Sequence, residues 1–205
     1  MTGDGILFVV SGPSGSGKSA VVSAALRSID RVVFSISYTT RKPRRGEVDG
    51  REYFFISEEQ FRQKIEADAF LEHAKVHGHY YGTSRSFVES QFKARQDVVL
   101  DIDVQGARQV CQKHPAAVTV FILPPSKQEL VRRLRERRSD DEEAMAVRIA
   151  QARLEIEASK DYGYLIVNQQ LELAIDQLRS IIQAERCRRE RSGRNIESVL
   201  AGFPP

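Results

Sequence analysis

The chain has 205 residues, of which 41% are hydrophobic and 29% charged, values that are ordinary for a globular protein with one well-buried core. The formal net charge is only +3, but arginine outnumbers lysine, and guanidinium groups bind phosphate through paired hydrogen bonds. No apolar run approaches eighteen residues and no signal-peptide pattern is present, so we expect neither export nor membrane spanning. Cys111 and Cys187 are not spaced as metal ligands and suit a reducing cytoplasm.

The first predicted element is a buried strand over residues 6–11, where Ile-Leu-Phe-Val-Val-Ser forms an apolar, β-branched run. The segment that follows matches the phosphate-loop pattern G-x-x-x-x-G-K-[ST], and residues 18–26 then indicate a helix whose positive end faces a bound anion. In such a loop the N–H groups cradle phosphates, Lys18 reaches the β- and γ-phosphates, and Ser19 binds Mg²⁺. Strand, loop and helix in this order predict a nucleoside triphosphate site rather than a glycine-rich turn without chemical meaning.

Four more runs predict the other core strands, over residues 32–36, 97–103, 118–123 and 164–167. Helical patterns lie between them, with apolar stripes over 145–156 and 171–182 and capping boxes that begin at Ser57 and Ser126. This alternation predicts an α/β fold with a mostly parallel sheet covered by helices on both faces.

Residues 39–96 interrupt the alternation with short strand patterns, a brief helix and many polar aromatic residues, so we interpret them as an inserted lobe. Arg41 and Arg44 lie on either side of Pro43, a spacing suited to clamping a phosphate dianion from two sides. The same residues could form an ordinary basic surface loop, but the nearby phosphate loop favours the clamp. The hydroxyl groups and the one carboxylate that suit a phosphate monoester and a base edge are provided by Ser37, Tyr53, Glu72, Tyr81 and Thr83.

Together these motifs resemble guanylate kinase, and the similarity runs from Ile6 to about Arg189. It rests on the order and spacing of the phosphate loop, residues 37–50, Glu72, residues 80–83 and the segment Leu-Asp-Ile-Asp-Val-Gln-Gly at 100–106. The resemblance implies a P-loop kinase core with a five-stranded parallel sheet in the order 2-3-1-4-5, an inserted GMP-binding lobe and a mobile helical lid. The implied boundaries are 1–38, 97–126 and 158–205 for the core, 39–96 for the lobe and 127–157 for the lid.

The resemblance also implies a reaction, ATP + GMP to ADP + GDP, with Mg²⁺ as cofactor, within purine nucleotide metabolism in the cytoplasm. ATP-binding roles are implied for the loop residues and for one residue of the adenine pocket: Gly12, Pro13, Ser14, Gly15, Ser16, Gly17, Lys18, Ser19 and Asn168. The GMP phosphate would be held by Arg41, Arg44, Tyr53 and Tyr81. Glu72 would accept from guanine N1–H and the 2-amino group, with Ser37 and Thr83 adding hydroxyl contacts to the base.

Asp101 and Asp103 end a predicted core strand beside the phosphate loop. The resemblance implies that they lie near Mg²⁺ or the acceptor nucleotide, with Ser19 on the metal and Asp101 acting on it through water. The alternative for both carboxylates is a solvated strand end.

Five arginines fall within residues 132–138 and would repel one another unless an anion lies among them. The family pattern implies catalytic roles for Arg133, Arg137 and Arg148, beside Lys18 and Arg41. Arg138 stands where the family often has glycine, and Gln169 stands where it commonly has aspartate. We expect the charged stretch 186–194 to be a solvated helix end and not a nucleic-acid surface.

Two other functions share part of this pattern. A kinase for adenylate or a sugar acid would share the phosphate loop and lid but would not need Glu72 with Ser37 and Thr83. Guanylate-kinase-like scaffold domains bind phosphopeptides and typically lack the intact loop found here. We therefore expect ATP and GMP as ligands, with no nucleic acid or membrane as partner. Use of dGMP and a homo-oligomeric state are left open.

Overall fold

A computed structural model describes residues 5–44, 46–76, 78–136, 142–191 and 198–203. At its centre is a five-stranded sheet with the order β2-β7-β1-β8-β9, and every neighbouring pair is parallel. Its strands are β1 (Leu7–Ser11), β2 (Val32–Phe34), β7 (Asp97–Asp101), β8 (Val118–Leu123) and β9 (Tyr164–Val167). The predicted α/β fold and parallel sheet are confirmed. β7 ends earlier than predicted because the Asp103 side chain accepts from Gly106 N–H and starts a helix.

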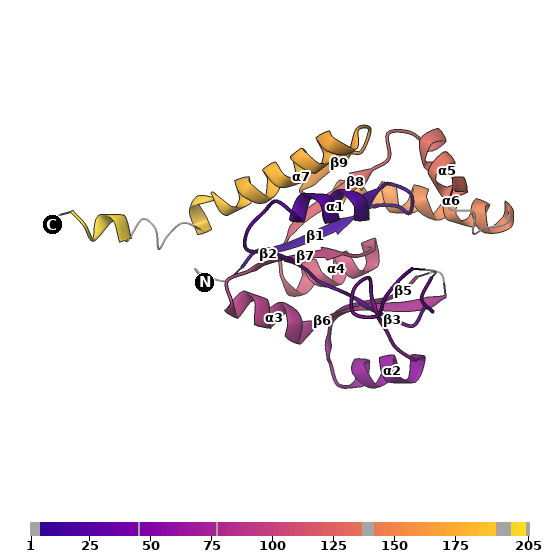
Figure 1. The fold of residues 1–205 in the computed structure, drawn as a ribbon, viewed down its shortest axis with the longest axis horizontal. Coiled ribbons are helices and arrows are strands. Elements are labelled where there is room, and N and C mark those ends of the chain that lie inside the picture. The colour runs from indigo at the N-terminus through magenta and orange to yellow at the C-terminus, as the bar shows by residue number, and fades with distance from the viewer. Residues whose placement is uncertain (1–4, 45, 77, 137–141, 192–197, 204–205) are drawn as a thin grey trace.

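Helices cover both faces of this sheet (Figure 1). On one face lie α1 (Lys18–Leu26) and α7 (Leu171–Arg186), and on the other lie α3 (Arg85–Lys93) and α4 (Val104–Lys113). Alternate residues of β1 belong to different core clusters, since Phe8 packs with Val21 and Leu178, whereas Val9 packs with Val110. A strand buried on both faces has no polar side to show, which explains the continuous apolar run.

A second sheet, in the order β4-β3-β6-β5, forms most of the inserted segment. The elements of this inserted segment are β3 (Tyr38–Thr39), β4 (Phe54–Phe55), α2 (Glu58–Glu66), β5 (Phe70–Val76) and β6 (His79–Ser84). The capping box at Ser57 is confirmed, because its hydroxyl accepts from Gln60 N–H and the Gln60 side chain accepts from Ser57 N–H. β3 and β6 were not predicted, since one has two residues and the other is rich in polar and small residues.

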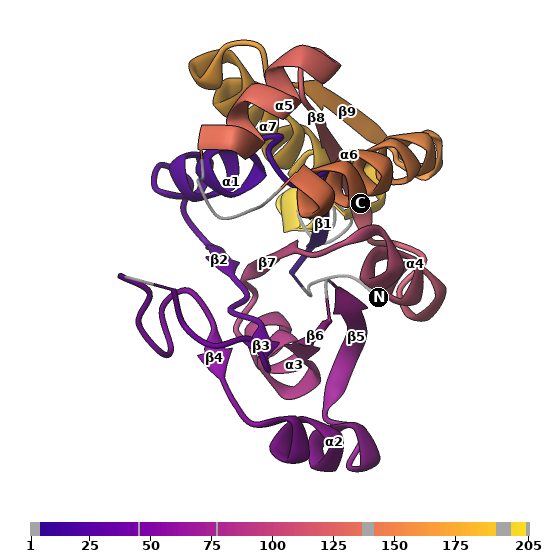
Figure 2. The same cartoon turned by 90° about the vertical axis from the view of Figure 1, so that its right-hand side faces the viewer.

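The region 127–157 contains α5 (Lys127–Glu136) and α6 (Glu142–Glu157), followed by the short helix η1 (Ala158–Asp161). Leu130 and Leu134 of α5 pack against Ala152 of α6, as the apolar stripe predicted. Figure 2 shows these helices and the second sheet on opposite sides of β1. Arg137 and Arg138 lie outside the described residues. Across the described helices, none is both long and apolar enough to cross a membrane.

α7 ends at Arg186 and residues 187–190 after it are exposed, as the charge pattern suggested, but two arginines of this segment are bound to acids. Arg186 donates to the Asp97 carboxylate at 2.7 Å and to the Asp30 carbonyl at 2.7 Å. Arg191, in η2 (Arg189–Arg191), lies 3.4 Å from the buried Glu185 carboxylate. The prediction is therefore wrong for these arginines, because the sequence does not show which acids the fold brings beside them.

Candidate active site

A cleft of about 300 Å³ lies where β1 and β7 end, between the phosphate loop, the second sheet and α6. Ligands of α/β proteins bind at this carboxyl edge of the parallel strands. The cleft brings together most of the residues predicted from the sequence: Gly12, Pro13, Ser14, Gly15, Gly17, Lys18, Ser19, Ser37, Arg44, Tyr53, Glu72, Tyr81, Asp101, Asp103 and Arg148. Ser16, Arg41, Thr83, Arg133 and Asn168 lie behind or beside this lining, and Arg137 lies outside the described residues.

The phosphate loop, residues 12–19, turns the chain from β1 into α1 as the motif predicts. Gly17 precedes the helix with a φ of 85°, in the left-handed region. A methyl group at this position would also lie 2.3 Å from the amide nitrogen of Asn168. Glycine is therefore required here both by the backbone angle and by its neighbour.

Two predicted ligand-binding residues support the loop from outside the cleft. Buried Asn168 donates through Nδ2 to the Ser16 carbonyl at 2.7 Å, and Arg133 donates to the same carbonyl at 3.2 Å. Arg133 also donates to the Asn168 carbonyl at 3.2 Å and to Glu129 at 2.7 Å. These contacts hold the loop backbone in place. Direct contact of Arg133 with a phosphoryl group, or of Asn168 with adenine, stays a prediction.

Lys18 and Ser19, at the end of the loop, share one carboxylate partner. Lys18 Nζ pairs with one oxygen of Asp101, and Ser19 Oγ donates to the other at 3.0 Å. Burial lowers the pKa of Lys18 to about 8, against the opposing influence of Glu155 and Asp103. A phosphate brought beside this ammonium would favour its charged form.

The oxygen atoms of Ser19 and Asp101 are the kind of ligands that Mg²⁺ prefers. No group of three or more His, Cys, Asp and Glu side chains capable of holding a metal occurs in the described part of the chain. A magnesium ion at Ser19 and Asp101 would therefore need water and phosphate oxygens to complete its coordination, which is the usual arrangement in kinases.

Glu72 lies on β5 and is only 3% exposed. Thr83 is its neighbour in the register of β5 and β6, and Thr83 Oγ1 donates to Glu72 Oε1 at 2.6 Å. Burial raises the pKa of Glu72 to about 7, with Asp103 adding to the rise and the Thr83 hydrogen bond opposing it. The carboxylate is thus a buried acceptor whose charge needs a ligand with complementary donors.

The basic cluster of the second sheet is organised by an acid that the sequence analysis did not assign to the site. Glu47 accepts two hydrogen bonds of 2.9 Å from the Arg41 guanidinium and one of 2.7 Å from the Arg44 backbone N–H. The pKa of Glu47 is lowered, chiefly by its hydrogen bond to Arg41. The guanidinium carbon of Arg41 lies 5.3 Å from the centre of the Tyr53 ring. The ion pair with Glu47 therefore holds the Arg41 side chain next to Tyr53, beside the cleft. An acid three residues after Arg44 was the signal that could have indicated it.

Glu155 is a second site residue that the sequence analysis missed. It lines the cleft from α6 together with Arg148, two helical turns earlier. Burial raises the pKa of Glu155 to about 7, and the neighbouring Asp103 adds to the rise while Lys18 opposes it. The seven-residue spacing, which places both side chains on one helix face, was the available signal.

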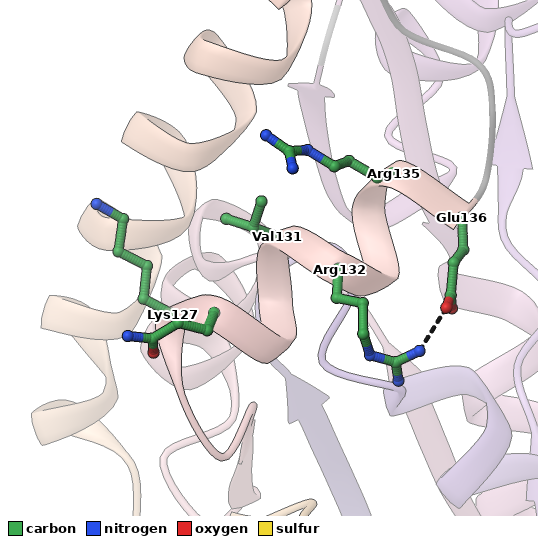
Figure 3. A pocket seen from close by; sticks show the side chains of 6 residues that line it. Lys127, Val131, Arg132, Arg135 and Glu136 are labelled. Carbon is green, nitrogen blue, oxygen red and sulfur yellow. Dashed lines mark hydrogen bonds and ion pairs between the residues drawn. The ribbon is translucent and has the colours of Figure 1, made fainter.

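A separate hollow lies on the outer face of α5, lined by Lys127, Gln128, Val131, Arg132, Arg135 and Glu136 (Figure 3). Its residues all belong to α5, and none of them lines the cleft. Arg132 pairs there with Glu136, and its guanidinium also bonds to Glu129. Of the predicted lid arginines, Arg132 is therefore neutralised on the outside of α5, whereas Arg133 faces the phosphate loop.

Comparisons with known proteins point to one family. The family model described as guanylate kinase matches residues 5–185. Guanylate kinase from Escherichia coli (strain K12) is 48% identical over 199 residues, which cover 96% of this chain and 96% of the relative. The enzyme from Caldanaerobacter subterraneus subsp. tengcongensis is 47% identical over 188 residues, 92% of this chain and 91% of the relative. The crystal structure of guanylate kinase from Anaplasma phagocytophilum aligns with a TM-score of 0.82 at 30% identity, covering 100% of this chain and 99% of that one.

Proposed function

The chain belongs to the guanylate kinase family, and from this premise we propose how its cleft is divided between two nucleotides. The chain is a nucleoside monophosphate kinase that transfers a phosphoryl group from ATP to GMP, giving ADP and GDP. The observation that carries the proposal is that Lys18 and Glu72 line the same cleft. We assign the phosphate-loop side to ATP and the side formed by the second sheet to GMP.

On the ATP side, the loop N–H groups, the positive end of α1 and the Lys18 ammonium would bind the phosphates. Asn168 and Arg133 would act on ATP indirectly, because their hydrogen bonds to the Ser16 carbonyl support the loop. Ser19 would hold Mg²⁺ directly and Asp101 would hold it through water, and the ion would neutralise part of the phosphate charge when bound. Lys18 then exchanges its Asp101 partner for phosphate oxygens.

On the GMP side, Arg44, Tyr53 and Tyr81 line the cleft where the acceptor phosphate would lie. Arg41 lies beside them, hydrogen-bonded to Glu47. Glu72 would accept from guanine N1–H and the 2-amino group, since an ionised carboxylate is purely an acceptor. The remaining base contacts are assigned to the Ser37 and Thr83 hydroxyls and to Asp103. Adenine offers a lone pair at N1 and lacks the 2-amino group, so it would leave the buried charge of Glu72 without donors.

The reaction then depends on alignment and charge more than on proton transfer. The GMP phosphate dianion is already a nucleophile, so no general base is needed, and the cationic side chains lower the repulsion between two polyanions. Arg148 lines the cleft from α6 and is assigned to the transferring group, as is Arg137 from the family pattern. Closure of the lid, proposed as residues 127–157, over the acceptor lobe, proposed as 39–96, would exclude water as a competing acceptor.

The direct test is a coupled assay with ATP and Mg²⁺ against a panel of nucleoside monophosphates. We expect turnover with GMP, and little with AMP, only when both ATP and Mg²⁺ are present. Equal or faster turnover with AMP would indicate another acceptor. Tight binding of a phosphopeptide without turnover of any nucleotide would favour the scaffold alternative.

Glu72→Gln tests the assignment of the base site. The glutamine amide keeps one acceptor oxygen, but its NH₂ group would face one of the two guanine N–H donors. We therefore expect kcat/KM for GMP to fall by about 10²-fold or more. The ratio of kcat/KM for GMP to that for AMP should narrow, and the KM for ATP should stay near its wild-type value. Glu66→Gln, at an exposed position of α2, is the matched control. A wild-type GMP/AMP ratio in Glu72→Gln would place base selection elsewhere.

A further inference from the structure

Gly106 lies buried in the first turn of α4, with its backbone against the Glu72 carboxylate. A methyl carbon at Gly106 would be 2.3 Å from Glu72 Oε2 and 3.0 Å from its carboxyl carbon. Both distances are far shorter than van der Waals contact, so no other residue fits while Glu72 keeps this position. The position is not in the left-handed region, so glycine is explained here by space alone.

The backbones on the two sides of this contact are joined to each other, so the Glu72 carboxylate is the part that has to give way. The other oxygen of Glu72 accepts from Thr83 at 2.6 Å. The strand that carries Glu72 is joined to α4, because Gln109 bonds to both the N–H and the carbonyl of His73, at 3.2 and 2.7 Å, and Lys113 donates to the Leu71 carbonyl at 2.6 Å. On the helix side, Gly106 N–H donates to the capping carboxylate of Asp103 at 2.9 Å. Figure 2 shows β5 and α4 on the same side of the molecule.

We propose that Gly106 is a specificity-determining position, which admits the Glu72 carboxylate to the place where it can accept two hydrogen bonds from guanine. Gly106 is a positioning residue and touches no substrate atom itself. The inference rests on the proposed GMP site. It implies that α4, a helix of the core, helps to select the base by setting the position of Glu72. A side chain at 106 displaces the carboxylate, and the two acceptors then no longer match the two donors of guanine.

Gly106→Ala tests the proposal, and alanine is the better helix former, so α4 is expected to form. We expect kcat/KM for GMP to fall by about 10-fold or more, because small displacements of a recognition group have large effects. The KM for ATP should change by less than about twofold, and the GMP/AMP ratio should narrow toward that of Glu72→Gln. Gly163→Ala is the matched control, since a methyl carbon there would lie 3.6 Å from the Thr119 carbonyl, in ordinary contact.

A second variant separates positioning from general damage. Glu72→Asp carries the same charge on a side chain one methylene shorter, which withdraws the carboxylate from residue 106. Measured against Glu72→Asp alone, the double variant with Gly106→Ala should lose less than about twofold further in kcat/KM for GMP. A full additional loss in the aspartate background, or wild-type GMP use by Gly106→Ala, overturns the proposal. Absence of GMP turnover in the wild-type protein would instead overturn the proposed function, so the two failures are distinguishable.

Discussion

The Asn168 side-chain amide donates a hydrogen bond of 2.7 Å to the Ser16 carbonyl and so joins the end of β9 to the phosphate loop. The same carbonyl accepts from Arg133, which brings α5 into the contact. The loop conformation therefore depends on residues that follow it by more than a hundred positions. The loop N–H groups that we propose bind the ATP phosphates are therefore oriented by these contacts as well as by the loop's own glycines.

Asn168→Ala should weaken this support. Loss of the amide leaves a buried carbonyl with one partner fewer, and we expect the free energy of unfolding to fall by about 1–3 kcal/mol. The KM for ATP should rise while that for GMP stays near wild type, as measured by chemical denaturation and steady-state kinetics. Gln169→Ala, the exposed neighbour, is the control. Equal changes in both KM values would contradict a loop-specific role.

Lys18→Met keeps the length of the side chain and removes its charge. We expect kcat to fall by about 10²-fold or more, since one preorganised stabilising group is lost from the transition state. GMP affinity, measured by calorimetry without ATP, should be little changed because the proposed GMP site lies on the side of the cleft formed by the second sheet. Lys93→Met, at an exposed position of α3, serves as the control. If GMP affinity disappears together with activity, the division into two nucleotide sites is wrong.

Glu47→Ala removes the carboxylate that orients Arg41 and accepts from the Arg44 backbone. We expect the KM for GMP to rise by about 10-fold, because the Arg41 guanidinium and the backbone at Arg44 would have to be ordered at the moment of binding. The KM for ATP should remain unchanged. Glu58→Ala, which breaks an exposed ion pair with Arg62 on α2, is the comparison. Tighter GMP binding by Glu47→Ala would show that Glu47 competes with the ligand for Arg41.

GMP binding should depend on pH through Glu72. Its pKa is raised to about 7, and only the ionised form accepts from both guanine donors. We therefore expect the Kd for GMP to rise on the order of tenfold as the pH falls from about 7.5 to about 6. The GMP phosphate also gains a proton near pH 6, so Glu72→Gln provides the baseline. Parallel pH profiles for the two proteins would exclude Glu72 as the titrating group.

The same residue should lower the stability of the protein without ligand. A carboxyl whose pKa is higher in the folded state binds more protons folded than unfolded, so its unfavourable effect is absent below about pH 4.5 and complete above about pH 7. Glu72→Gln should therefore raise the free energy of unfolding by about 1–3 kcal/mol at pH 8 and by little at pH 4.5. Denaturation at both pH values measures this. A destabilised Glu72→Gln at pH 8 would contradict the assignment.

Much of the fold could be predicted from local sequence patterns. The phosphate loop and the apolar strands depend on neighbouring residues, and the parallel sheet follows from strand–helix alternation. β3 was not predictable in this way, because its two residues, Tyr38 and Thr39, are too few to show the alternation of polar and apolar side chains that marks a strand. The site depends more on long-range pairing. The register between β5 and β6 brings Thr83 to Glu72, and no local pattern encodes that register.

The roles of charged residues were the least predictable part. Arginines at 133 and 186 look alike in the sequence, yet one supports the phosphate loop and the other is bound to Asp97 at the far end of the sheet. Their partners come from distant segments, so composition reveals only that charge is present. Glu155 was missed for the same reason, since it meets Asp103 and Lys18 only in the fold. Glu47 was missed although its partners Arg41 and Arg44 are close in the sequence.

The hydrogen bonds of Gln109 and Lys113 that join β5 to α4 bear on the order in which the parts of a nucleotide are recognised. The strand that carries Glu72 is joined to the core helix α4, whereas the segment between β3 and β4, which carries Arg41 and Arg44, follows a strand of only two residues. We therefore expect the base of an incoming nucleotide to meet Glu72 before the proposed closure of the lid. A nucleotide with the wrong base would then dissociate before the proposed closure, and the ATP phosphates would not be brought into position for transfer.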